Sequence, residues 1–382
     1  MRRTARALSE TALAISPWAP APKPHSAAAV TAQWLTEVFA PRAPAAVVEN
    51  IRPLDGTTGT TDRQRLALDW NRIGQNSGMP ASVFVKSTPL SAKNRTMVAA
   101  LDMAINEVAF YQQIRPELDA DIAPEVYACH AGHGARHLLV LEDLAAKNAT
   151  FPDTVRDVDL AHVQALIHAL GRVHAAYWNS PRLHTDLAWI APERARPGFD
   201  LLLWQFRKMR RTLLAAPEHD LPAPVRRMAE FANDHDKALH ARWEVGPQTV
   251  LHGDAHCANT FRLPDGRVGL LDWQVIHCGP GIREISYLLT HSTPTEVRRG
   301  NEEQLLRLYL STLREYGVTD PPTFDEAWTA LRFFAFDAWD SIAMCVAWPG
   351  LQPPERVALG FATANIAIED LEVDKVIRAA LS

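Results

Sequence analysis

The chain has 382 residues, more than one compact core usually holds, so its length favours two lobes or domains. A formal net charge of −5 argues against a nucleic-acid-binding protein, which would be expected to carry a basic face. No run of eighteen apolar residues occurs, so we expect neither a membrane span nor a membrane partner.

The N-terminus is basic, but no continuous apolar segment precedes a cleavage site. Prolines recur from Pro17 to Pro24 and predict an extended conformation, so we expect residues 1–25 to form a loose N-terminal extension. The arginine-rich, acid-poor start is also compatible with a transit peptide. Because the four cysteines are scattered without a CxxC pair, we expect a reducing compartment and a cytoplasmic protein.

A predicted hairpin follows the extension. Ser26 can cap a helix over 27–40, and a strand near 48–54 leads into a segment rich in glycine and threonine. A tip containing Gly56 and Gly59 could lie over nucleotide phosphates, with backbone N–H groups directed inward. The segment is neither a Walker loop nor a complete GxGxxG, so an ordinary hairpin explains it equally well on its own.

A lysine and a glutamate come next. Residues 81–86 form a hydrophobic strand that ends in Lys86, and apolar spacing predicts one long helix over about 93–114 that carries Glu107. A Lys–Glu pair between a strand and the next helix holds the phosphate-binding lysine of kinases in place. The alternative is a surface lysine and a solvated glutamate. The order of the motifs favours the kinase interpretation.

After an apolar strand over 137–144 the chain is predicted to be mainly helical. His174 lies on or beside the apolar face of the first helix, where a hydrogen-bonded core histidine is more common than a catalytic one. The apolar spacing predicts helices over 159–178, 198–215, 222–243, 301–316, 324–346 and 354–379.

The most informative stretch runs from Val250 to Gln274 and contains four polar residues with a defined spacing: His252, Asp254, Asn259 and Asp272. Between Asn259 and Asp272, a Pro-Asp-Gly turn predicts a hairpin whose short buried second strand presents Asp272 at its end. Phosphoryl transfer requires such a set of residues. One Asp accepts the proton of the attacking hydroxyl, and an Asn and a second Asp supply oxygen ligands to Mg²⁺.

The same residues could instead form a zinc site or a purely structural turn. His252, Asp254 and His256 form an HxDxH pattern beside Cys257, and all of these residue types can bind zinc. A zinc site would leave the spacing of Asn259 and Asp272 without a role. In the structural alternative, a polar turn packs around a buried Asp.

The motifs occur in the order VFVK, NEVAFY, LVLED, LGRVHAAYW, VLHGDAHCANT and LLDWQ. This order resembles the aminoglycoside phosphotransferase and choline kinase superfamily, and the HAAYW and DWQ segments are most similar to its ecdysteroid kinase-like branch. The resemblance covers about residues 50–375. It implies an α+β, bilobal, protein-kinase-like fold. Residues 26–143 would form a small lobe with an antiparallel sheet, and residues 144–382 a larger, mainly helical lobe.

The resemblance also implies an ATP-dependent phosphotransferase that uses Mg²⁺ and a small-molecule hydroxyl acceptor. Asp254 would be the base, supported by His252, and Asn259 and Asp272 would bind the metal. Lys86 and Glu107 would anchor the phosphates. Main-chain groups between Leu141 and Asp143 would contact adenine. One departure is Glu284, which stands where relatives typically have an Asp that braces the catalytic loop, and a longer side chain could brace it less rigidly.

The acceptor is the least determined part of the reaction. The predicted helix over 324–346 is rich in Phe and Trp, and these rings could line a pocket for a lipophilic alcohol, although packing of the core is their more common role. Asp337 and Asp340 could begin a carboxylate cluster for an aminoglycoside, but we expect them to face solvent. We favour a lipophilic alcohol over a polycation. An aminoglycoside phosphotransferase, a non-catalytic nucleotide-binding pseudokinase and a metal-dependent hydrolase are the alternatives.

Overall fold

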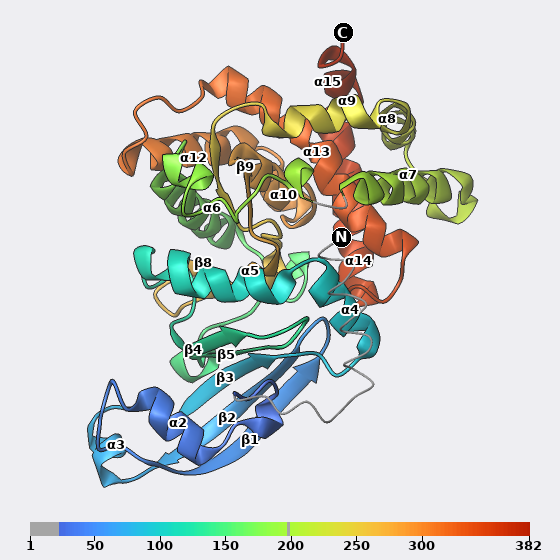
Figure 1. The fold of residues 1–382 in the computed structure, drawn as a ribbon. Helices are drawn as coiled ribbons and strands as arrows, with labels where there is room; N and C mark the ends of the chain where they lie inside the picture. The colour runs from blue at the N-terminus through green and yellow to red at the C-terminus, as the bar shows by residue number, and fades with distance from the viewer. Residues whose placement is uncertain (1–22, 197–198) are drawn as a thin grey trace. The chain divides into compact units, whose positions relative to one another are not determined.

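The computed structural model describes residues 23–196 and 199–382, which form two compact units (Figure 1). The first unit extends to Thr150 and also includes Leu271–Val275, and the second comprises Phe151–Leu270 and Ile276–Ser382. Most of the predicted N-terminal extension lies outside the described residues. Within those residues, no helix combines the length and the apolar character that a bilayer crossing requires.

The first unit is built on a five-stranded sheet in which every neighbouring pair of strands is antiparallel. The strand order is β1-β2-β3-β5-β4. The sequence did not predict β4, because its residues lack a clean alternation and are only partly buried. The strands are β1 (Val48–Thr58), β2 (Asp62–Trp70), β3 (Ser82–Ser87), β4 (Val126–Ala131) and β5 (His137–Glu142).

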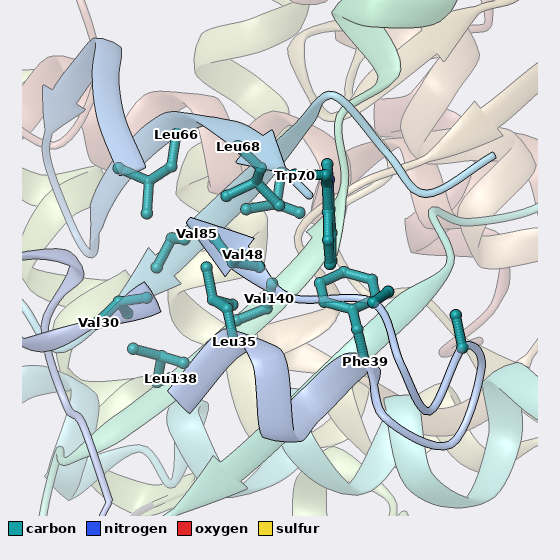
Figure 2. Close-up of a cluster of buried hydrophobic side chains, with 13 residues drawn as sticks. Val30, Leu35, Phe39, Val48, Leu66, Leu68, Trp70, Val85, Leu138 and Val140 are labelled. Carbon is teal, nitrogen blue, oxygen red and sulfur yellow. The ribbon is translucent and has the colours of Figure 1, made fainter. Parts of the chain in front are cut away.

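Helix α2 (Ala32–Phe39) covers one face of this sheet. Its Leu35 and Phe39 pack on alternate residues of the strands, including Val85 and Val140 (Figure 2). The predicted start of this helix was wrong. Residues 27–29 form only a 3-10 turn, and the side chain of Thr31 instead caps α2 by accepting a hydrogen bond from the backbone N–H of Trp34 at 3.1 Å.

The opposite face of the sheet carries Lys86, because side chains alternate along β3. Helix α5 (Met103–Ala109) lies on this side, opposite to α2 (Figure 1). The prediction of one long helix over 93–114 was wrong. Asp102 has a left-handed backbone (φ 56°) that separates α4 (Ala92–Ala100) from α5, and residues Phe110–Ile114 continue as a π-helical turn.

The second unit is mainly helical. The side chain of Asp159 caps α6 by accepting a hydrogen bond from the backbone N–H of His162. Two predicted helices are divided in the structure, one near His235 and the other at Glu372, whose φ of 50° interrupts the helix. The main helices are α6 (Leu160–Ala176), α7 (Phe199–Ala215), α8 (Ala223–Asp234), α9 (Asp236–Ala241), α10 (Ile282–His291), α12 (Glu302–Glu315), α13 (Phe324–Ala347), α14 (Pro354–Asp370) and α15 (Val373–Ala379).

Two small antiparallel sheets position the loop that contains Asp254. Strand β6 (Gln248–Leu251) pairs with β9 (His277–Pro280), and β7 (Thr260–Arg262) pairs with β8 (Val268–Leu270). The second pair is the hairpin that the sequence predicted, and Gly266 adopts the positive φ of 90° that its turn requires. The polar loop therefore leaves one buried strand and enters another.

Candidate active site

Lys86, Glu107 and Asp272 form a buried charged cluster in the first unit. The Lys86 Nζ donates to Glu107 Oε1 at 2.8 Å and to Asp272 Oδ1 at 2.7 Å. The side chains of Lys86 and Glu107 are almost fully buried, whereas that of Asp272 is 19% exposed. The structure therefore brings together two residues that the sequence paired and a third that lies 186 positions beyond Lys86.

The cluster contains one more carboxylate than ammonium group. Burial alone would lower the pKa of Lys86, but the charges of Asp272 and Glu107 outweigh it and raise that pKa. Burial and the nearby Asp272 together raise the pKa of Glu107 to about 7. The negative charge of the two carboxylates is therefore only partly compensated by Lys86. Asp272, the one partly exposed member of the cluster, is suited to bind a further cation.

Asp272 is held in place by its neighbours in sequence. It has a left-handed backbone (φ 66°) directly after the β8 hairpin. Trp273 stacks on Phe110 with ring centroids 3.9 Å apart, and the Asn106 side chain donates to the backbone oxygen of Gln274. Segment 271–275 is thus packed against helix α5 and the π-helical turn that follows it.

The predicted glycine-rich tip is shorter than expected. Strand β1 continues to Thr58, so Gly56 lies inside the strand and only Gly59–Thr61 form the turn. Gly56 is required by close packing, because a Cβ there would lie 2.8 Å from the backbone oxygen of Arg63. The Asn94 side chain donates to the Gly59 oxygen at 2.6 Å and ties the turn to helix α4.

The carboxylate of Asp143 has a structural role. It is buried and accepts hydrogen bonds from Arg65, Ser82 and the backbone N–H of Ala145. Only the main chain of Asp143 is therefore left as a candidate for adenine recognition. Leu141 lies within β5, where it is paired in register with residues of both β3 and β4.

In the second unit, Asp254 is oriented by two neighbours. The Tyr287 hydroxyl donates to its Oδ1 at 2.6 Å, and the Asn259 Nδ2 donates to its Oδ2 at 3.1 Å and to its backbone oxygen at 3.0 Å. The His252 Nδ1 accepts from the backbone N–H of Asp254 at 3.2 Å, so His252 supports the loop. Tyr287 was not predicted from the sequence; it lies on α10, 33 residues after Asp254.

Glu284 braces the same loop with both carboxylate oxygens. They accept hydrogen bonds from the backbone N–H groups of His252 at 3.0 Å and Gly253 at 2.6 Å. The His174 Nε2 lies 3.1 Å from Glu284 Oε2, and its Nδ1 lies 3.0 Å from the Tyr309 hydroxyl. Burial acts to raise the pKa of Glu284, but its hydrogen bonds with His174 and with the backbone of Gly253 help to outweigh burial, so that pKa is lowered. His174 is therefore a hydrogen-bonded core residue, and the longer Glu284 reaches the loop that an Asp was expected to brace.

The zinc hypothesis finds no support in this arrangement. Within residues 23–196 and 199–382, no three His, Cys, Asp or Glu side chains are grouped so that they could hold a metal ion. Burial also raises the pKa of the Cys257 thiol to about 11, which opposes formation of the thiolate that zinc requires.

A pocket in the second unit borders the Asp254 loop. Tyr287 and His291 of α10 line it, and α13 contributes Ser341, Ile342 and Cys345. None of its lining residues is an aspartate or a glutamate, and none is one of the Phe or Trp residues of α13. The complete lining is Val155, His256, Cys257, Tyr287, His291, Ser292, Ser341, Ile342, Cys345, Gln352, Arg356 and Gly360.

Most of the aromatic rings of α13 pack the core of the second unit, so they do not line an acceptor pocket as the sequence had suggested they could. Phe336 and Trp339 are fully buried. The expectation that Asp337 and Asp340 face solvent was wrong, because Asp337 pairs with Arg283 and Asp340 with Arg210, both inside the core. These carboxylates therefore cannot form a solvent-exposed acceptor cluster.

A sequence profile of the ecdysteroid kinase-like family matches residues 60–318, which is more than half of the chain. The chain belongs to the ecdysteroid kinase-like family. As a member of this family, it is a small-molecule kinase. A search of curated protein sequences gives no significant match.

Solved structures show which fold this member of the ecdysteroid kinase-like family has. The ethanolamine kinase of Plasmodium vivax matches with a TM-score of 0.52 at 10% identity, over 90% of this chain and 89% of that chain. A choline/ethanolamine kinase family protein of Mesorhizobium loti gives 0.47 at 14% identity, over 86% and 92% of the two chains. The choline kinase of Streptococcus pneumoniae gives 0.44 at 14% identity, over 89% and 98%. The first of these matches confirms the predicted kinase-like α+β fold.

Proposed function

We propose that the protein transfers the γ-phosphate of ATP to a hydroxyl group of a small molecule in a reaction that requires Mg²⁺. The observation that carries this proposal is the buried cluster of Lys86, Glu107 and Asp272. A lysine held by a glutamate of the following helix is the phosphate anchor of kinases, and the third member is a carboxylate suited to a metal. The chain folds these residues together although Asp272 is remote in sequence.

In the proposed reaction the acceptor oxygen forms a bond to the γ-phosphorus. The bond from that phosphorus to the β–γ bridging oxygen breaks, ADP leaves, and the hydroxyl proton passes to the carboxylate of Asp254. The side chain of Asp254 is 31% exposed, so an acceptor can reach it, and Tyr287 and Asn259 fix its orientation. Because phosphoryl transfer has a loose transition state, this positioning is the main contribution of the residue.

Asp272 and Asn259 would hold the Mg²⁺ ion. Carboxylate and carboxamide oxygens are ligands that this ion accepts, and the amide nitrogen of Asn259 is already committed to Asp254, which leaves its oxygen as the ligating atom. The bound ion would neutralise charge on the nucleotide phosphates. The excess of carboxylate over ammonium groups around Lys86 supports this assignment.

Replacement of Asp272 by alanine is expected to remove the Mg²⁺-dependent part of nucleotide binding. Wild-type protein should be stabilised more by Mg-ATP than by ATP with a chelator, because a ligand that binds only the native state raises the melting temperature. In the Asp272→Ala variant, Mg-ATP and ATP with a chelator should raise the melting temperature by the same amount. Thermal melting with and without chelator measures this difference, and a variant that retains the full Mg²⁺-dependent increment would contradict the assignment.

Replacement of Lys86 by methionine is expected to weaken Mg-ATP binding more than replacement of Glu107 by glutamine. The first change removes the ammonium group that contacts phosphate, whereas the second removes only a charge that orients it. Titration calorimetry with Mg-ATP ranks the two variants. If Glu107→Gln is the more damaging change, Glu107 has a role other than holding Lys86.

The acceptor is proposed to be an uncharged hydroxyl compound that binds in the pocket beside Tyr287. The lining supplies hydroxyl, imidazole and amide groups and the guanidinium of Arg356, which is paired with Asp153. It contains no carboxylate, so it offers nothing to compensate the charge of a polycation. An ATP-consumption screen with sterols, sugar alcohols, choline-like amines and aminoglycosides tests the function and the acceptor together. Stimulation by an uncharged alcohol supports both. Stimulation by kanamycin-type compounds alone would overturn the acceptor, and ATP binding without turnover on a broad panel would indicate a non-catalytic protein.

A further inference from the structure

Arg63 lies directly across the sheet from Lys86. The two residues are register partners on β2 and β3, so their side chains lie on the same face of the sheet. The Nε atom of Arg63 is buried and makes no hydrogen bond, and within the described residues no carboxylate forms an ion pair with its guanidinium. Arg65, two residues further along β2, is by contrast paired with both Asp55 and Asp143.

The guanidinium of Arg63 reaches the turn between β1 and β2. A Cβ added to Gly59 would lie 3.0 Å from the Arg63 Nη2, and the turn itself is fixed by the bond from Asn94 to the Gly59 oxygen. The positive charge of Arg63 is also among those that lower the pKa of the Glu107 carboxyl. Arg63 is therefore near both the turn and the cluster around Lys86.

The charges of the first unit explain why a second cation is needed. Lys86 is in contact with two carboxylates, so its positive charge is already compensated before any nucleotide binds. A triphosphate carries several negative charges. A cation that is not paired with a carboxylate attracts these charges more strongly than a cation that is already paired. A partly buried guanidinium that makes no direct ion pair is costly, and an anionic ligand would reduce that cost.

We propose that Arg63 binds the phosphates of the nucleotide and forms, with Lys86, a two-cation phosphate site beneath the β1–β2 turn. This inference rests on the proposed function, in which the first unit binds ATP. The planar guanidinium can donate two parallel hydrogen bonds to one phosphate group, which the ammonium of Lys86 cannot do. Arg63 thus contributes affinity for the phosphates and not for the adenine or ribose.

The test is titration calorimetry of the full chain with Mg-ATP, with tripolyphosphate and with adenosine. Arg63→Leu should weaken the binding of Mg-ATP and of tripolyphosphate by roughly 10- to 100-fold, the value of a charge-assisted hydrogen bond. Its affinity for adenosine should equal that of wild type. Arg63→Lys keeps the positive charge but not the planar pair of N–H donors, so its affinity for Mg-ATP and tripolyphosphate should lie between those of wild type and Arg63→Leu. Arg52→Leu is the matched control, since Arg52 is an exposed β1 arginine paired with Asp69.

The outcomes separate the two proposals. If wild-type protein binds neither Mg-ATP nor tripolyphosphate, the proposed function fails. If wild type binds them and Arg63→Leu binds them within about twofold of the Arg52→Leu control, the inference about Arg63 is wrong. An equal loss of adenosine and Mg-ATP binding would also overturn it, because that result indicates a structural role. If Arg63→Leu does not fold, Arg63→Lys decides. A weaker affinity for tripolyphosphate with unchanged adenosine binding supports the inference, whereas wild-type affinity for tripolyphosphate or a loss of adenosine binding contradicts it.

Discussion

Replacing Asp254 by asparagine is expected to lower the turnover number by roughly 10²–10⁴-fold, the usual contribution of general-base catalysis. The change keeps the size of the side chain, and its amide oxygen can still accept from Tyr287, while Asn259 keeps its bond to the backbone oxygen of residue 254. It removes the group that accepts the acceptor's proton. Affinity for Mg-ATP should stay within about twofold of wild type, because Asp254 is not part of the proposed phosphate anchor. Initial rates of ATP consumption with the best acceptor and calorimetric titration of Mg-ATP measure the two quantities separately.

Asp265→Asn is the matched control for this experiment. Asp265 is an exposed carboxylate at the β7–β8 turn, where it pairs with Arg267, and it has no role in the proposed reaction. Its substitution should leave turnover unchanged. Near-wild-type turnover in Asp254→Asn would remove Asp254 from the role of base, and a parallel loss of Mg-ATP affinity would show that the residue acts on the nucleotide.

Local sequence patterns predicted the parts of the site that depend on a single segment. The hairpin before Asp272 could be predicted because Pro264-Asp-Gly266 has the chemistry of a turn and the flanking residues alternate. Lys86 and Glu107 could be paired because a strand end and the next helix are close in sequence and therefore close in space. Such short-range relations can be predicted without knowledge of the tertiary fold.

The contacts that the sequence did not reveal join distant segments. Tyr287 orients Asp254 from another helix, and nothing in its neighbourhood distinguishes it from a core tyrosine. The break at Asp102 was also not evident, because the apolar spacing continues on both sides and only the backbone conformation interrupts the helix. Apolar periodicity identifies helical segments more reliably than it identifies where each one ends.

Asp337 and Asp340 show that the burial of charged residues also depends on segments that are distant in sequence. Two carboxylates three positions apart on an aromatic helix are normally expected to face solvent, since unpaired buried charges are rare. Here arginines from other elements, Arg283 and Arg210, pair with them inside the core. The residue pattern of one helix shows where its carboxylates are, but it does not show the arginines of other elements that allow these carboxylates to be buried.

Replacing Arg210 by methionine is expected to destabilise the protein by about 3–5 kcal/mol, the cost of breaking a buried ion pair by removing one partner. Arg210 on α7 is fully buried, donates to Asp236 Oδ1 at 2.8 Å and pairs with Asp340 on α13. The substitution would leave the buried carboxylate of Asp340 without its cation and would leave Asp236 with only its longer arginine contact, to Arg207 at 3.8 Å. Urea unfolding followed by circular dichroism measures the loss, and Arg211→Met, at the exposed neighbouring position, should change stability by no more than about 0.5 kcal/mol.

A triple variant distinguishes the unpaired charges from a simple loss of packing. Replacing Asp236 and Asp340 by leucine in the Arg210→Met background removes the carboxylates together with the arginine, and such apolar replacements of buried ion clusters are often neutral or stabilising. The triple variant should therefore recover most of the stability lost by Arg210→Met alone. If it is instead less stable than the single variant, the cluster contributes net stabilisation through its hydrogen bonds. A single variant no less stable than Arg211→Met would contradict the prediction, because it would show that the carboxylates of Asp236 and Asp340 are accommodated without Arg210.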